Sequence, residues 1–225
     1  SKLILPDLAI LDPLLTINLP PNITASTGID AMVHAIEAYT SINPNNNPIS
    51  KMLSIEALKF LGSSIKTAVF EGHNINARSN MLFGSMLAGK AFANSPVAAV
   101  HALAYPIGGL FNISHGLSNS LVLPSVMKFN SINEETKKNY ANLAPYVFKD
   151  LDNSNSDEIV CNNFIDSLES LSKELKLPYR LRDLEIPEEA CQLMASEAMK
   201  QTRLLVNNPR KIEESDAFNI YKSVW

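Results

Sequence analysis

The sequence predicts a mainly α-helical protein with a single strand near its beginning, and three observations support this fold class. From about residue 22 onward, apolar residues recur at helical spacing, as Ile29, Met32, Val33 and Ile36 do. Residues 91–127 contain no Asp, Glu, Lys or Arg, which indicates the buried centre of a globular protein. Prolines, glycines and asparagines interrupt that stretch too often for a membrane-spanning helix of roughly 20 apolar residues.

The first twenty residues differ from the rest of the chain. Leu8-Ala9-Ile10-Leu11 is a short apolar run that ends at Asp12-Pro13, a pattern typical of a buried strand. A strand needs partner strands to be stable, and no second strand pattern follows. We therefore expect residues 1–20 to be the tail of an N-terminal α/β domain whose remainder is absent, and residues 21–225 to form a helical domain.

Periodicity and stop signals predict the helices in order. The first runs to about Tyr39, with Asn22 or Thr24 as its N-cap, and an Asn-rich loop at residues 43–48 follows it. Further helices are expected at residues 49–70, 75–94, from Pro96 to a break at Gly108-Gly109, 117–127, 134–148, 158–176, 188–203 and 213–224.

Composition excludes several classes of function. The net charge is −4, the pI is about 5.6, and no run of Lys or Arg forms a basic patch. An acidic surface of this kind argues against nucleic acid and against an anionic membrane as partners. Cys161 and Cys191 have neither metal-site spacing nor the density of a disulfide scaffold. Since the N-terminus shows no signal-peptide pattern, we expect a cytoplasmic protein, and a homo-oligomer is left open.

Four polar residues point to a metal site. Asp30 and His34 are four positions apart on a predicted helix, so they share a face that borders its apolar stripe. His101 and His115 lie inside the uncharged stretch. Burying such groups without partners costs on the order of several kcal/mol for a charged form, and a shared metal ion would satisfy all four.

One carboxylate and three imidazoles suit Fe²⁺, Zn²⁺ or Mn²⁺, and the absence of thiolate argues against a structural zinc site. From spacing alone, the alternative that each histidine is an ordinary core residue stays open. His73 lies in a polar turn and is left out of the site.

Several ordered motifs resemble the iron-containing alcohol dehydrogenases. The similarity covers essentially the whole chain, and it rests on Thr27-Gly-Ile-Asp-Ala-Met-Val-His-Ala-Ile-Glu-Ala-Tyr39, Ala88-Gly-Lys-Ala-Phe92, Val100-His-Ala-Leu-Ala-Tyr-Pro-Ile-Gly108, Ile113-Ser-His-Gly116 and Asn208-Pro-Arg210. The resemblance implies that Asp30, His34, His101 and His115 bind the metal, with Fe²⁺ expected and Zn²⁺ as the alternative.

The same resemblance implies an N-terminal domain that binds NAD or NADP, a helical metal domain, and an active site in the cleft between them. It implies hydride transfer between a small alcohol and its aldehyde or ketone, and a fragment that is inactive without the cofactor domain. Cofactor-binding residues within this chain stay unassigned, and the sequence does not identify the alcohol.

One position departs from the family pattern. Many members have a second histidine four residues after the ligand that corresponds to His101, where this sequence has Tyr105. That histidine is often assigned to proton transfer or cofactor contact. Tyr105 is therefore a candidate catalytic residue, as a weaker acid of pKa about 10. The alternative is a wall of the substrate pocket.

Three rival functions remain to be weighed. A helical metal-dependent phosphohydrolase would usually show an adjacent His-Asp pair, which this sequence lacks. A lyase of the dehydroquinate synthase type would have Glu in place of Asp30 and basic residues near the site. A helical metal-binding domain without activity of its own is the third reading, and it applies to the isolated chain.

Two further residues each allow two interpretations. Glu37, one turn beyond His34, is either a partner for a ligand histidine or half of an ion pair between helices. Gly28 either lets backbone approach a cofactor or substrate, or allows two helices to pack closely.

Overall fold

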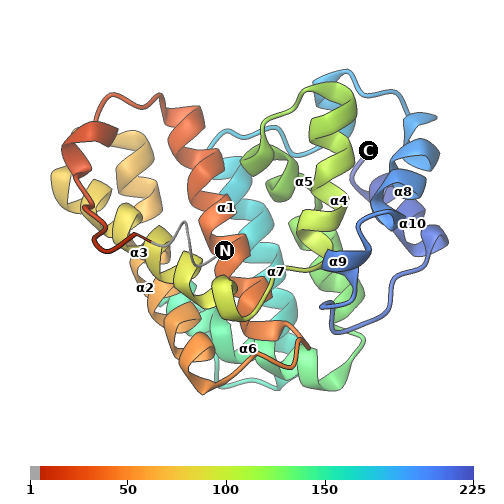
Figure 1. Ribbon diagram of the computed structural model, residues 1–225, viewed down its shortest axis with the longest axis horizontal. Helices are drawn as coiled ribbons and strands as arrows, with labels where there is room; N and C mark the ends of the chain where they lie inside the picture. Colours follow the sequence, from red (N-terminus) through yellow and green to blue (C-terminus); the bar gives the residue numbers. More distant parts are fainter. Residues whose placement is uncertain (1–5) are drawn as a thin grey trace.

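A computed structural model describes residues 6–225, and within that range it is built from helices alone (Figure 1). The elements in order are η2 (Pro13–Thr16), α1 (Pro21–Thr40), α2 (Pro48–Phe70), α3 (Ile75–Asn94), α4 (Ala99–Phe111), α5 (His115–Asn130), α6 (Glu134–Val147), α7 (Asp157–Glu174), η3 (Leu181–Leu184), α8 (Ala190–Met199), α9 (Thr202–Leu205) and α10 (Glu214–Ser223). The mainly α-helical class is confirmed.

The strand expected at Leu8–Leu11 is not formed, which corrects that element of the prediction. The described residues offer no second strand to complete a hydrogen-bonded ladder, and an unpaired strand is not stable. Leu8 and Ile10 are 75% and 81% exposed, so their apolar side chains have no cover within this part of the chain.

Several helix boundaries match the sequence prediction, and the misses have local causes. α3 spans Ile75–Asn94 as predicted. α1 begins at Pro21 and not at a polar cap, because proline lacks the N–H that the first turn leaves unpaired. α4 runs through Gly108-Gly109, where a break was expected, and ends at Phe111. Its C-cap is Asn112, whose φ of 55° lies in the left-handed region.

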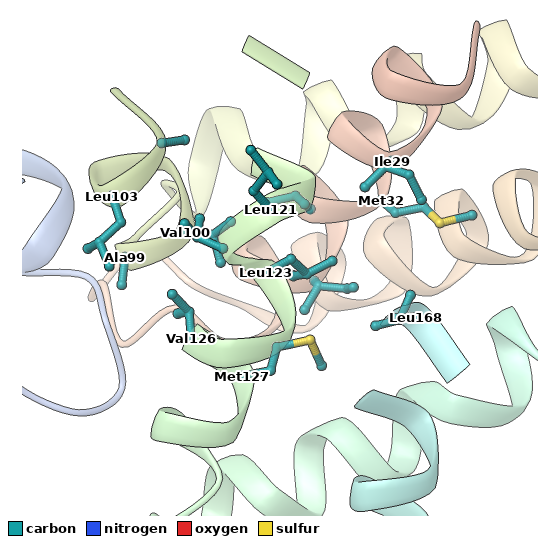
Figure 2. Packing of buried hydrophobic residues seen from close by; sticks show 14 of the residues in the cluster. Ile29, Met32, Ala99, Val100, Leu103, Leu121, Leu123, Val126, Met127 and Leu168 are labelled. Atoms are coloured by element: carbon teal, nitrogen blue, oxygen red, sulfur yellow. The ribbon is translucent and has the colours of Figure 1, made fainter. Parts of the chain in front are cut away.

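Helix α1 lies at the centre of the molecule. It packs against α2 and α3 on one side and against α5 and α6 on the other (Figure 1). Its apolar residues Ile29 and Met32 belong to one buried cluster with side chains of α4, α5 and α7, among them Val100, Leu123 and Leu168 (Figure 2). The core therefore surrounds the helix that carries two of the four predicted metal ligands.

Much of the uncharged stretch lies in the interior, as its composition predicts, but several of its positions are exposed, among them Tyr105, Leu110 and His115. It supplies α4 and most of α5, and their apolar residues, including Leu103, Leu121, Val126 and Met127, are 3% exposed or less (Figure 2). Within the described residues, no helix combines the length and the apolar character that crossing a lipid bilayer requires.

A matched pair of glycine substitutions tests the packing of α2 on α6. A Cβ at Gly62 would lie 2.6 Å from the carbonyl oxygen of Val147, and backbone cannot move aside as a flexible side chain does. We expect Gly62→Ala to lower the free energy of unfolding by about 1–3 kcal/mol in urea titrations. At Gly89 no atom lies within 4 Å of the added Cβ, so Gly89→Ala should stabilise the helix by roughly 0.5–1 kcal/mol. Equal effects at the two positions would contradict the observed helix packing.

Candidate metal centre

The structure brings the four predicted ligands together from three helices. Asp30 and His34 are one turn apart on α1, His101 lies in the first turn of α4, and His115 is the first residue of α5. Asp30 Oδ1 lies 3.8 Å from His101 Nε2 and 3.6 Å from His115 Nε2. The Nε2 atoms of His34 and His101 are 3.2 Å apart. Asp30, His34 and His101 each offer one ligand atom within 4.8 Å of the others.

Hydrogen bonds determine which ring nitrogen of two histidines carries the proton. His34 Nδ1 lies 2.9 Å from the backbone carbonyl oxygen of Asp30, and His101 Nδ1 lies 2.6 Å from Oε2 of Glu37. A carbonyl and a carboxylate can only accept, so both Nδ1 atoms donate. In the neutral rings, both Nε2 atoms then present lone pairs.

These two lone pairs face each other across 3.2 Å, next to the Asp30 carboxylate. Lone pairs on two nitrogens and a negative oxygen repel one another unless a cation lies between them. Around a first-row divalent ion with metal–nitrogen bonds of about 2.0–2.1 Å, tetrahedral ligand atoms are roughly 3.3–3.5 Å apart. The observed separations of 3.2, 3.6 and 3.8 Å fit such an ion.

Burial supports the neutral form of His34. Its pKa is lowered from the ordinary value, first because burial penalises the charged ring and then because His101 is close. A neutral imidazole is the form that binds a metal ion. His101 is 2% exposed and His115 46% exposed as side chains, so the cluster is closed on the α4 side and open beside His115.

Glu37 contacts the cluster from its buried side. It lies on the same face of α1 as Asp30 and His34, at the next helical turn, and it is 4% exposed. Its Oε1 accepts the backbone N–H of Val100 at 2.6 Å, and its Oε2 accepts Nδ1–H of His101. Of the two sequence interpretations, the structure therefore shows the partner of a histidine. The same carboxylate caps α4, which has no side-chain cap of its own.

Asn119 completes the cluster, and the sequence analysis did not identify it. Its Nδ2 donates to Asp30 Oδ1 at 2.5 Å and lies 3.2 Å from His115 Nε2. Its own Oδ1 is buried without a hydrogen-bond partner in the described residues. The four-residue spacing of His115 and Asn119 on one helical face was the available signal.

Close backbone contact places the start of α5 against α1. A Cβ at Gly116 would lie 2.7 Å from the carbonyl carbon of Ser26. Only glycine allows this approach, and it brings His115 towards Asp30. At Gly28 a Cβ would meet the side chains of Met81 and Ile65 at 2.8 and 2.9 Å, which supports the packing interpretation.

Aromatic rings border the histidines. Phe92 stacks on His34 with 4.7 Å between ring centroids, a contact that the sequence did not reveal. The Tyr105 ring lies 5.9 Å from the His115 ring and is partly exposed, so this candidate residue lies beside the open side of the cluster. His73 lines a separate surface cavity with Arg78, apart from the four predicted ligands.

Comparison with known proteins gives one consistent family. The model for "Fe-containing alcohol dehydrogenase family, C-terminal" matches residues 24–225. Long-chain-alcohol dehydrogenase 1 of Geobacillus thermodenitrificans is 40% identical over 225 residues, which are 99% of this chain and 55% of that protein. The chain spans about half the length of the curated relatives that it matches.

Solved structures that resemble this chain agree with the family match. An alcohol dehydrogenase from Oenococcus oeni superposes with a TM-score of 0.89 at 34% identity, over 95% of this chain and 54% of its own. A sulfoacetaldehyde reductase from Bifidobacterium kashiwanohense in complex with NAD⁺ superposes with a TM-score of 0.81 at 28% identity, over 95% and 53%.

The contact between Glu37 and His101 predicts the effect of Glu37→Gln. The amide oxygen can still accept from Val100, but its NH₂ group then faces Nδ1 of His101 and favours the tautomer with the proton on Nε2. We expect Zn²⁺ or Co²⁺ affinity to fall roughly 10–100-fold, with far-UV circular dichroism unchanged. Glu189→Gln, at an exposed position on α8's N-terminal side, is the control and should bind as wild type does. Unchanged affinity in Glu37→Gln would contradict this role.

Proposed function

The chain belongs to the iron-containing alcohol dehydrogenase family, and from that premise we propose that the intact protein interconverts an alcohol with its aldehyde or ketone using NAD or NADP. The observation that carries the proposal is the pair of facing Nε2 lone pairs beside the Asp30 carboxylate. Relatives described as alcohol dehydrogenases, and a structural relative in complex with NAD⁺, support the reaction and the cofactor.

Asp30, His34, His101 and His115 would hold the metal, with Fe²⁺ as the proposed ion and Zn²⁺ as the alternative. The set has no thiolate, in keeping with a catalytic and not a structural site. When bound, the ion supplies Lewis acidity that polarises the substrate oxygen and stabilises its negative charge as hydride moves to or from the nicotinamide.

The chain's own residues position and shield this chemistry. Glu37 keeps the His101 ring oriented with its proton on Nδ1, and Asn119 donates to the Asp30 oxygen nearest to His115. Phe92 covers one face of His34. Residues 91–127, which include His101 and His115, carry no formal charge, so this stretch offers no ion-pair partner to a charged substrate.

We further propose that residues 1–20 are the tail of an α/β cofactor domain and that residues 21–225 are the metal-binding domain. The exposed apolar residues Leu8, Ile10 and Leu15, at 75%, 81% and 82%, support this, because a soluble protein usually covers such a group. The isolated chain would then bind metal without transferring hydride.

Reconstitution tests the reaction. Full-length protein loaded anaerobically with Fe²⁺ should oxidise NADH or NADPH with at least one member of a panel of aldehydes, and a chelator should abolish the activity. No metal-dependent oxidation across the panel would contradict the proposed function.

Metal analysis tests the ligands. Asp30→Ala removes the one carboxylate of the cluster and should reduce bound metal well below one equivalent, as measured by mass spectrometry of the desalted protein. Asp183→Ala, at an exposed position in η3, is the control. Equal metal content in Asp30→Ala and wild type would overturn the ligand assignment.

Tyr105→Phe tests the candidate catalytic residue. If the hydroxyl carries the proton to or from the substrate, kcat should fall on the order of 10²-fold. A kcat that matches wild type would assign Tyr105 to the pocket wall.

A further inference from the structure

A groove of about 640 Å³ lies between the C-terminal halves of α5, α7 and α10, and none of the four proposed metal ligands lines it. Part of its wall is the segment of α5 from Ser120 to Lys128, which follows the turn that carries His115 and Asn119. The groove is therefore a separate feature on the helix that serves the metal centre.

The groove is basic although the chain is acidic. Its lining includes one carboxylate, Glu169, and five basic side chains, which are Lys128, Lys173, Arg180, Arg182 and Lys222. The whole chain has a net charge of −4. A local excess of positive charge in such a protein attracts anions by its field, which a concave wall of low dielectric strengthens.

Carboxylates neutralise the three lysines but not the two arginines. Lys173 pairs with Glu169 at 2.7 Å, Lys128 lies 3.4 Å from Asp166, and Lys222 pairs with Glu188. Among residues 6–225, no carboxylate lies within ion-pair distance of Arg180 or Arg182. The two guanidinium groups thus keep their charge uncompensated at the groove.

Aromatic rings hold both guanidinium groups in place. Arg180 lies over the Tyr179 ring at 5.5 Å, and Arg182 lies over the Trp225 ring at 5.5 Å. The Trp225 ring is itself anchored, because Nε1 donates to the carbonyl oxygen of Ile186 at 2.9 Å. A guanidinium group that lies over an aromatic ring still offers its planar fork of N–H donors to an oxyanion.

Serine side chains lie between the charged groups. Ser120, Ser125, Ser172 and Ser223 line the groove. The hydroxyls of Ser120, Ser172 and Ser223 donate to carbonyl oxygens of their own helices, which leaves the Ser125 hydroxyl as a neutral donor. The guanidinium forks are therefore the main donors that the groove offers to phosphate oxygens. The volume falls within the range of roughly 300–1,000 Å³ that is typical of small-molecule sites.

We propose that this groove binds a small organic compound carrying two or more phosphate groups. Two guanidinium groups without carboxylate partners offer charge for two phosphates and not only for one. The acidic residues Glu169 and Glu188 beside the lysines disfavour a nucleic acid backbone, which would pass close to them.

Calorimetry on the intact protein, saturated with NADH so that the cofactor site is filled, tests the proposal with fructose 1,6-bisphosphate and inorganic phosphate as probes. We expect saturable binding of the bisphosphate, and affinity about tenfold or more weaker for inorganic phosphate. The double variant Arg180→Gln/Arg182→Gln should weaken bisphosphate binding at least about tenfold. Both arginines are exposed and form no ion pair within residues 6–225, so the variant should stay folded, with a far-UV circular dichroism spectrum like that of wild type.

A matched control separates the groove from general surface charge. Arg203→Gln/Lys138→Gln removes the same charge at exposed positions outside the groove and should bind the bisphosphate as wild type does. Trp225 lies beside Arg182 in the groove, so bisphosphate should change the fluorescence of the intact protein, and Trp225→Phe should remove that part of the change. No saturable binding by wild type, or an equal loss of affinity in both double variants, would overturn the proposal.

Discussion

The candidate metal centre depends on one buried carboxylate between two helices. Glu37 of α1 accepts the N–H of Val100 and Nδ1–H of His101, both at 2.6 Å. The first bond satisfies an unpaired donor at the N-terminus of α4, and the second turns the lone pair of His101 towards His34. The interaction that docks α4 on α1 is therefore the interaction that orients a metal ligand.

Helix α1 both carries metal ligands and packs in the centre of the core. One face of α1 carries Asp30, His34 and Glu37, while Ile29 and Met32 on other faces pack into the core. Burial of those side chains leaves α1 little freedom to rotate, since protein interiors are close-packed. The ligand geometry is thus supported by the packing of the whole domain and not by a flexible loop.

The features of the site that the sequence predicted are those that depend on helical periodicity and on composition. The spacing of Asp30 and His34 placed them on one face, and the uncharged stretch placed His101 in the interior, where it is 2% exposed. The sequence did not predict Asn119 or the stacking of Phe92 on His34. Both contacts join residues that are distant along the chain. The four-residue spacing of His115 and Asn119 is also common among ordinary surface pairs. The expected strand at Leu8–Leu11 failed because its pattern says nothing of whether partner strands are present.

The central claim is that His34 and His101 both carry their proton on Nδ1, so that two lone pairs converge on a cation. Long-range ¹H–¹⁵N correlation spectra of ¹⁵N-histidine-labelled protein report the tautomer directly, with signals assigned through single His→Gln variants. We expect the Nδ1–H tautomer for both rings in metal-free protein and a large shift of both Nε2 signals on addition of one equivalent of Zn²⁺. An Nε2–H tautomer at His101, or Nε2 signals unmoved by Zn²⁺, would contradict this claim.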